Sequence, residues 1–201
     1  MTTLFQAFSG ILIAIFLYYG MDIRRKSGAR DFAAPAWQIV MKLCSLLLVG
    51  AFFLVTLSAR HVSLADWLDL SLMIIGTAFV TAAKRELGRA HTFTGQFLEN
   101  TRLVTTGVYA TTRNPLYFGV LLCEVGASLF VVHQGTIMFP QSHSHGISFL
   151  AAALIYAVWF NWNMAAREAR YLLGYFGEEY RRYSQDVPFV IPVFRLRKDL
   201  V

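Results

Sequence analysis

The sequence predicts an all-α integral membrane protein with five transmembrane helices, and two observations lead to this prediction. The chain has 201 residues, of which 56% are hydrophobic and only 15% are charged. A soluble domain is about 25% charged. The apolar residues fall into five blocks, each close to the roughly 20 residues that a helix needs to cross a bilayer. We therefore expect one membrane domain over residues 1–201.

The five apolar blocks give the expected helices in chain order: residues 4–19, 36–58, 64–83, 115–132 and 147–164. A signal peptide would begin with basic residues, but here the basic cluster Arg24–Lys26 follows the first block, so we expect a retained helix. Asp66 and Asp69 suit the first turn of the third helix, where the helix dipole favours negative charge. Pro115 suits the first turn of the fourth helix.

The charged, tyrosine-rich residues 165–201 follow the fifth block and predict a further, amphipathic helix over about residues 165–184. One stripe of apolar and aromatic side chains recurs there at helical spacing: Leu172, Phe176, Tyr180 and Tyr183. Gly177 interrupts the pattern and is expected to end or kink this helix. Pro188 and Pro192 lie beyond its end.

The distribution of basic residues predicts the orientation. Of the 18 Lys and Arg residues, 17 lie in the connectors after the first, third and fifth blocks or near the start of the second block, and Arg60 is the exception. The positive-inside rule then places the N-terminus outside and the C-terminus in the cytoplasm. The two long polar regions, 84–114 and 165–201, share the cytoplasmic face and can form one site.

Several other classes of function are not expected. The net charge of +6 follows from the topology signal, and no arginine-aromatic surface pattern indicates nucleic-acid binding. Cys44 and Cys123 fall inside apolar blocks and are expected to pack as small hydrophobic residues. His143 and His145 have no third ligand or carboxylate nearby in sequence, so we expect no metal.

The polar stretch LVTTGVYATTRNPLYFG, residues 103–119, is the most informative part of the chain. Pro115 forces Asn114 away from the α region and begins a helix. The polar residues 109–114 therefore lie at the mouth of a membrane helix. Free backbone N–H groups and the positive end of the helix dipole are available there for an anionic group.

This stretch resembles the core of the isoprenylcysteine carboxyl methyltransferase family, whose pattern is roughly LVxxGVYxxxRHPxYxG. The segment REARYLLGYFGEEYRRYSQDVPFVIP is similar to the second block of that family, EExxLxxxFGxEYxxYxxxVPxxIP. The two blocks cover residues 102–119 and 167–192, about a fifth of the chain, and agree in order and spacing. These are integral membrane S-adenosylmethionine-dependent enzymes, related to phospholipid methyltransferases.

The resemblance implies a membrane enzyme that moves a methyl group from S-adenosylmethionine to a lipophilic or small apolar acceptor. It implies that ten residues bind the cofactor at the cytoplasmic face: Thr101, Arg102, Leu103, Val104, Tyr109, Asn114, Pro115, Leu116, Tyr117 and Glu168. For catalysis we expect Arg113, which suits the cofactor carboxylate, and Glu124. Membrane lipid is the other expected partner.

Glu124 lies midway through the fourth helix, where a charged residue is costly and usually functional. It is expected either to face the acceptor and take a proton or meet an amine, or to form a hydrogen bond with a neighbouring helix. The other candidates also have structural alternatives. Arg113 can mark a cytoplasmic helix end, Tyr109 and Tyr117 can be interface aromatics, and Glu168 can pair with a neighbouring arginine.

The chain departs from the family pattern at three positions. Asn114 replaces the usual His, so it keeps a hydrogen-bonding side chain but cannot become a cation. Ala169 replaces the second acidic residue of the EE pair. Met164 stands where the prenylcysteine enzymes carry an Arg that binds the substrate carboxylate. A phospholipid amine, a thiol and a prenylcysteine all remain possible acceptors, and Met164 argues against the last.

Two other functions remain open. A membrane reductase of the sterol-reductase type has a related RxPxY-and-tail arrangement and would bind NADPH, although five helices are fewer than expected for it. A non-catalytic membrane scaffold is the second alternative, and the convergent Tyr, Arg and Glu residues of the two polar regions argue against it.

Overall fold

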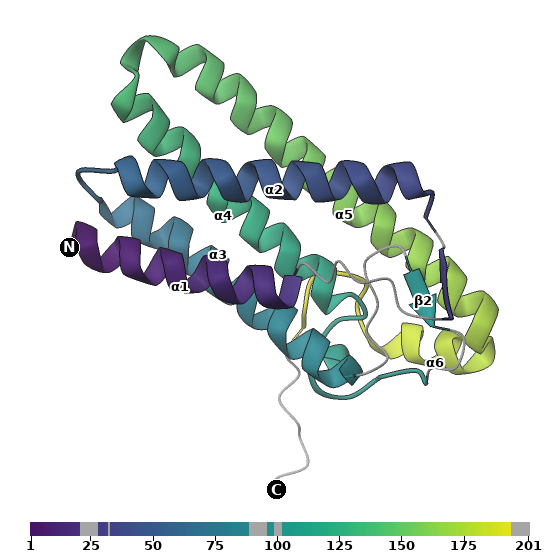
Figure 1. Cartoon of the computed structure of the whole chain (residues 1–201). Helices are drawn as coiled ribbons and strands as arrows, with labels where there is room; N and C mark the ends of the chain where they lie inside the picture. Colours follow the sequence, from purple (N-terminus) through teal and green to yellow (C-terminus); the bar gives the residue numbers. More distant parts are fainter. Residues whose placement is uncertain (21–27, 32, 89–95, 99–101, 194–201) are drawn as a thin grey trace, which may run out of the picture.

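Five long helices dominate the computed structural model of the chain (Figure 1). It describes residues 1–20, 28–31, 33–88, 96–98 and 102–193. All five helices are long and apolar enough to cross a membrane, which confirms the predicted class. Their bounds are α1 Thr2–Gly20, α2 Pro35–Ser58, α3 Leu64–Leu87, α4 Pro115–Met138 and α5 His143–Phe176.

The later helices extend past their predicted ends, and α5 differs most. The prediction separated a membrane helix over 147–164 from a second helix over about 165–184. Instead α5 is continuous from His143 to Phe176, and the short helix α6 follows at Glu178–Asp186. Gly177 has a φ of 54°, in the left-handed region that favours glycine, and this ends α5. Falling hydropathy marked the edge of the apolar layer, but polar residues do not by themselves end a helix.

The helices α3 and α4 form the most extensive interface of the bundle and are held together by small residues. A Cβ atom on Gly76 would lie 2.5 Å from the carbonyl oxygen of Gly119, and one on Gly126 would lie 2.5 Å from that of Asp69. Glycine is therefore required at these positions, because it lets two membrane helices approach backbone to backbone. This contact fixes α4, which carries the end of the polar stretch on its first turn.

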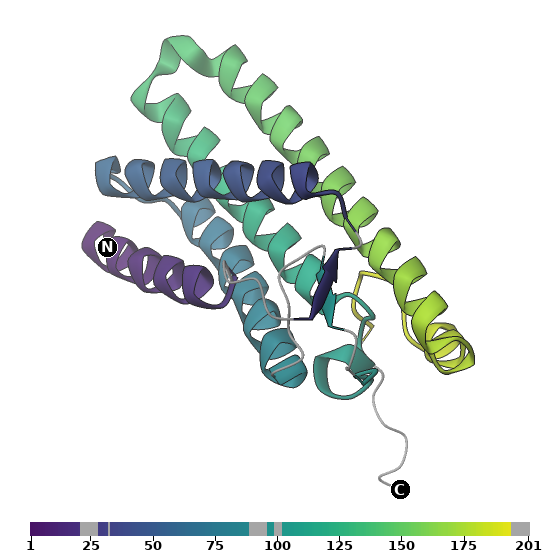
Figure 2. The ribbon, with the colours of Figure 1, turned by 45° about the vertical axis from the view of Figure 1, so that its right-hand side comes forward.

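Two short strands join connectors that are far apart in sequence. The strand β1, Ala29–Asp31, pairs antiparallel with β2, Gln96–Leu98 (Figure 2). The side chain of Gln96 strengthens this pairing by donating a hydrogen bond to Asp31, with Nε2 2.9 Å from Oδ1. These strands were not predicted from the sequence. They draw the connector after α1 and the connector after α3 to the same end of the bundle.

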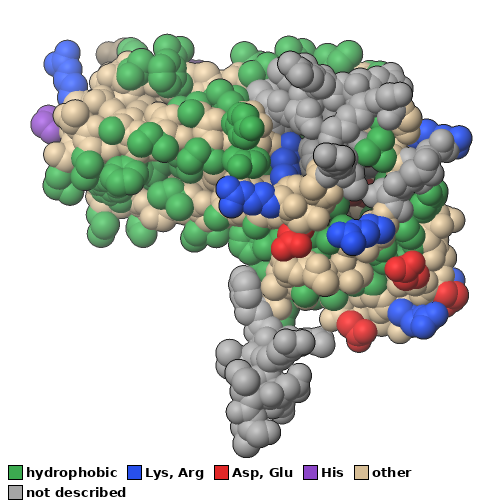
Figure 3. Space-filling model, turned by 60° about the horizontal axis from the view of Figure 1, so that its bottom comes forward, with side chains coloured by type: hydrophobic (Ala, Val, Ile, Leu, Met, Phe, Trp, Pro, Cys, Tyr) green, Lys and Arg blue, Asp and Glu red, His purple; other side chains and the backbone are tan. Residues whose placement is uncertain are grey.

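One end of the molecule carries most of the polar material. The ends of α1, α3 and α5 and the starts of α2 and α4 are directed toward this half of the molecule in both ribbon views (Figures 1 and 2). In Figure 3, hydrophobic side chains spread over the helices, and most of the charged side chains gather at the end that carries α6. The two polar regions of the sequence therefore come together at one end, as expected. The assignment of this end to the cytoplasm stays a prediction.

Candidate active site

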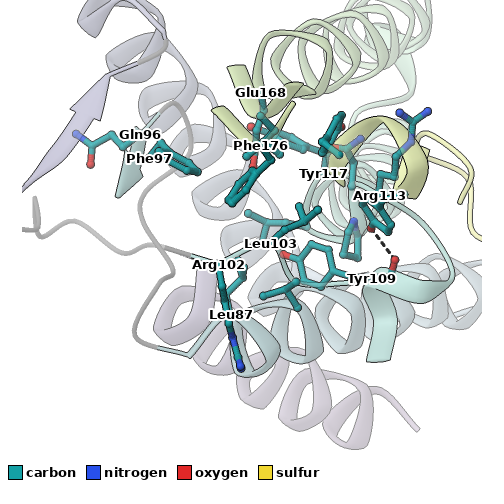
Figure 4. A pocket seen from close by; sticks show the side chains of 17 residues that line it. Leu87, Gln96, Phe97, Arg102, Leu103, Tyr109, Arg113, Tyr117, Glu168 and Phe176 are labelled. Atoms are coloured by element: carbon teal, nitrogen blue, oxygen red, sulfur yellow. Dashed lines mark hydrogen bonds between the residues drawn. The ribbon is translucent and has the colours of Figure 1, made fainter. Parts of the chain in front are cut away.

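A cavity lies at this polar end, enclosed by residues 102–104, the connector before α4, the end of α5 and the helix α6 (Figure 4). Its volume is about 790 Å³, including the space at its open mouth. The wall includes the short 3₁₀ helix η2, Gly107–Ala110, which places Tyr109.

The cavity collects nearly all the residues that the sequence analysis singled out for the cofactor. The members that line it are Arg102, Leu103, Val104, Tyr109, Asn114, Pro115, Leu116, Tyr117 and Glu168. Arg113, expected in catalysis, also lines it. Thr101 lies outside the described residues. Glu124 does not line this cavity, since it lies seven residues beyond Tyr117, about 10 Å further along α4.

Several lining residues were not recognised as part of a site. The stripe of the C-terminal region, Leu172, Phe176, Tyr180 and Tyr183, faces the cavity over its whole length. Its helical spacing was visible in the sequence, but such a stripe is equally typical of ordinary packing. Phe97 reaches the cavity from β2, and its ring lies 4.9 Å from that of Tyr175. Nothing in its local sequence indicated this position.

The segment 187–193, which we call the C-terminal strap, crosses the connector before α4 and holds it through backbone hydrogen bonds. The N–H of Arg113 donates to the carbonyl of Pro188, and the N–H of Val193 donates to the carbonyl of Thr111, both at 2.9 Å. The buried hydroxyl of Thr112 donates to the carbonyl of Val190 at 2.8 Å. The strap therefore positions the polar wall of the cavity.

Asn114 completes this attachment. Its side chain is buried, and Nδ2 donates to the carbonyl oxygen of Phe189 at 2.7 Å. Its backbone N–H donates to the hydroxyl of Thr112 at 3.3 Å. An amide suits this position because it donates a hydrogen bond without carrying a charge, so Asn114 ties the connector to the strap.

Glu168 projects from α5 toward the cavity beside the hydroxyl of Tyr117 (Figure 4). Within the described part of the chain, Glu168 forms no ion pair. The buried Tyr117 hydroxyl lies close to this carboxyl, but it reaches hydrogen-bond geometry with no described residue. Buried polar groups are normally satisfied, and exceptions point to a ligand or a catalytic role. The carboxyl is therefore available to a cationic group inside the cavity.

The phenols that line the cavity outside the membrane helices are held in the neutral form. Burial raises the pKa of Tyr109 well above its usual value, and the nearby Glu168 raises it further. Burial also raises the pKa of Tyr180, although the guanidinium of Arg113 opposes the shift. The hydroxyl of Tyr183 donates to the carbonyl of Tyr109 at 2.6 Å. These side chains can shape and orient a ligand, but they are poor bases near neutral pH.

Arg113 contributes a cation to the same wall. Its guanidinium carbon lies 5.3 Å from the centre of the Phe189 ring, a cation–π geometry. Its Nε is buried and has no hydrogen-bond partner among the described residues. Packing against Phe189 in the strap fixes the guanidinium at the edge of the cavity wall.

A separate polar cluster lies at the opposite end of α3 and α4. Ligand atoms of Asp66, Asp69 and His133 lie within 4.8 Å of one another, a spacing that a metal ion would accept. Asp66 and His133 lie on different helices, so this cluster was not predicted from the sequence. The oxygens of Asp66 already accept hydrogen bonds from Ser63, His133 and Gln134. The cluster is remote from the cavity.

Comparison with known proteins supports the resemblance. The model of the phospholipid methyltransferase family matches residues 64–179, more than half of the chain. The chain belongs to this family. The matched segment of this chain includes α3, α4 and α5, and therefore most of the cavity wall.

Two named relatives agree with this family. The chain is 31% identical over 129 residues to protein-S-isoprenylcysteine O-methyltransferase B of Arabidopsis thaliana, which covers 61% of this chain and 57% of the relative. It is 30% identical over 91 residues to protein-S-isoprenylcysteine O-methyltransferase of Schizosaccharomyces pombe, 45% of this chain and 33% of the relative. The chain thus spans about half or less of the length of these relatives.

Proposed function

We propose that this protein is a membrane methyltransferase that binds S-adenosylmethionine in the cavity and methylates a lipophilic acceptor. The observation that carries the proposal is Glu168, a carboxyl that faces the cavity without an ion-pair partner in the described part of the chain. The family match supports methyl transfer rather than NADPH-dependent reduction. The cavity argues against a non-catalytic scaffold, because polar groups in its wall have no hydrogen-bond partner among the described residues.

The residues present fit this cofactor by their chemistry. When bound, S-adenosylmethionine supplies an activated methyl group on a sulfonium, together with an ammonium and a carboxylate. The carboxyl of Glu168 suits a cationic group, whereas Arg113 and the N-terminus of α4 suit an anionic one. The rings of Tyr109 and Phe176 offer faces for a cation or an aromatic base.

The protein contributes orientation and exclusion of water rather than covalent chemistry. The C-terminal strap closes the wall beside Arg113 and Asn114, and Tyr183 fixes the backbone at Tyr109. Alignment of two reacting groups inside a dry site accounts for a large part of a bimolecular barrier.

The acceptor is the point at which this chain departs from its named relatives. Met164, at the position of the family's carboxylate-binding Arg, is 4% exposed and packs with Tyr117, Phe160 and Val190. Methionine offers neither charge nor a hydrogen-bond donor, and a carboxylate brought there would lose its hydration without compensation. We therefore propose a neutral or amine acceptor.

Binding measurements test the cofactor assignment. Isothermal titration calorimetry on detergent-purified protein should show saturable binding of S-adenosylmethionine and none of NADPH. Binding of NADPH alone would support the reductase, and binding of neither ligand to folded protein would favour a scaffold.

A methyl-transfer assay tests the acceptor. With labelled S-adenosylmethionine, we expect methylation of a lipid-amine mixture or an alkyl thiol to exceed that of a farnesylcysteine analogue by at least about ten-fold, since an unpaired buried charge costs more than 1.4 kcal/mol. A Met164→Arg variant should narrow this difference. Efficient methylation of the farnesylcysteine analogue by the unmodified protein would contradict the argument from Met164.

A further inference from the structure

A second cavity lies between α2, α4 and α5, within the membrane-spanning part of the bundle. Its volume is about 920 Å³, including the space at its open side, and its lining is largely apolar, with Leu47 from α2 and Phe149 from α5. It shares no lining residue with the cavity at the polar end. Leu47 is 73% exposed, so this cavity borders the lipid-facing surface.

A small polar group interrupts this apolar lining. Glu124 and Ser128 from α4, Tyr156 from α5 and Cys44 from α2 all line the cavity. Glu124 is 7% exposed, and its Oε2 accepts a hydrogen bond from Nδ2 of Asn161 at 2.7 Å. Within the described residues, its other oxygen has no partner. The hydroxyl of Tyr156 is likewise buried without a hydrogen bond.

An incompletely satisfied carboxyl is costly at this depth. Ionisable side chains within membrane helices are rare, face the protein interior, and usually mark a functional site. A purely structural carboxyl would use both oxygens, as Asp66 does at the end of α3. Glu124 uses one oxygen to bridge α4 and α5, and the other has no partner among the described residues, so it is open to a molecule beside it.

Glu124 lies apart from the first cavity. The helices α4 and α5 run antiparallel and bring two polar pairs together, Glu124 with Asn161 and Tyr117 with Glu168. The members of the two pairs are seven residues apart on each helix, which is about 10 Å. Buried side chains that include Met164 pack between them. The polar end of a molecule bound at Glu124 therefore lies outside the first cavity.

We propose that this second cavity binds a membrane-soluble molecule with an apolar body and a terminal hydrogen-bond donor, an alcohol or an amine. The donor would meet the free oxygen of Glu124, next to the hydroxyl of Tyr156, and the apolar body would lie against α2 and α5. None of the described lining residues is basic, so a lipid that ends in a carboxylate or a phosphate does not suit the site. This inference does not depend on the proposed methyl transfer.

Photolabelling of the full chain in lipid nanodiscs tests the proposal. The probes are diazirine derivatives of hexadecanol, hexadecylamine and hexadecane, and labelled peptides are identified by mass spectrometry. We expect the alcohol and the amine to label peptides that contain Cys44 or Tyr156. Unlabelled alcohol or amine should compete at concentrations at least about ten-fold lower than the hydrocarbon, the ratio expected for one hydrogen bond to a carboxyl group.

Two substitutions at Glu124 test whether this carboxyl recognises the polar probes. Glu124→Leu should abolish the preference for both polar probes. Glu124→Gln keeps an oxygen acceptor, so it should retain labelling by the alcohol and weaken labelling by the amine, and this variant decides the question if Glu124→Leu does not fold. Glu178→Gln, on an exposed side chain of α6, is the matched control and should change nothing. Equal labelling by all three probes, or labelling insensitive to Glu124, would overturn the proposal.

Discussion

The two ends of the helical bundle each hold a carboxyl near a helix terminus, but the two carboxyls differ in how many partners the protein gives them. Asp66 at the start of α3 is fully buried and accepts hydrogen bonds from Ser63, Gln134 and His133 at 2.7 to 3.0 Å. Glu168 near the end of α5 faces a cavity and forms no ion pair within the described chain. A buried carboxyl needs partners. Asp66 finds these partners within the fold, whereas Glu168 is available to a ligand. The number of hydrogen-bond partners, rather than the degree of burial, therefore distinguishes the structural carboxyl from the one in the candidate site.

The sharpest test of this comparison concerns the membrane itself, because the two ends should lie on opposite sides. With Cys44 and Cys123 replaced by Ala, a cysteine at Gln141 should react with an impermeant maleimide added to intact cells. A cysteine at Glu179 should react only after the cells are opened. This all-or-none contrast follows from the basic residues of the sequence. The reverse pattern would place the cavity outside and contradict cofactor binding from the cytoplasm.

The next largest effect is expected for Asp66→Ala. The substitution removes the capping box of α3 and one of the two hydrogen bonds that the Gln134 amide donates, the other going to the carbonyl of His61. We expect a loss of about 2–4 kcal/mol in the free energy of unfolding, measured by denaturant titration in detergent. The affinity of the folded fraction for S-adenosylmethionine should stay the same. A large loss of affinity would show that the two ends are coupled.

For Glu168→Gln we expect the reverse, a loss of ligand affinity without a loss of stability. A contact with a charged group contributes about 1.5–3 kcal/mol, so the affinity for S-adenosylmethionine should fall on the order of ten- to a hundred-fold. The stability of the ligand-free protein should not fall, since no ion pair is lost in the described part of the chain. Glu178→Gln serves as the control. Unchanged affinity in a folded Glu168→Gln protein would remove this residue from the site.

The smallest effect is expected for Asn114→Ala, which breaks one hydrogen bond to the C-terminal strap. We expect a loss of about 1–2 kcal/mol in stability and a drop in S-adenosylmethionine affinity of less than about ten-fold, because Asn114 positions the wall. Asn114→His keeps a donor and should recover most of the affinity. If histidine fails while the strap stays protected in hydrogen exchange, Asn114 acts on the ligand directly.

Sequence reasoning predicted most of the fold because a membrane helix is a local, strongly patterned element. The starts of the helices agree best, as at Pro115, where proline determines the position. The ends agree least. The continuous α5 passes through Arg167 without interruption, since the change from apolar to polar reports the membrane boundary and only Gly177 changes the backbone.

The part of the candidate site that lies in the two sequence blocks, residues 102–119 and 167–192, was predictable. Tyr109, Tyr117 and Glu168 come together because their blocks lie at the same end of antiparallel helices. The contribution of Phe97 depends on the pairing of β2 with β1, a non-local contact between three-residue strands. The contact of Asn114 with Phe189 spans 75 residues and involves a backbone carbonyl, which leaves no signature in residue type.

The C-terminal strap also has a consequence for biosynthesis. Chains emerge from the ribosome from N- to C-terminus, and segments fold in the order in which they become available. The connector before α4 receives its partners Pro188, Phe189 and Val190 only after all five helices have been synthesised. A nascent chain can therefore insert its helices while the polar wall is still unattached, and the protein should acquire its ligand only after translation has passed the strap.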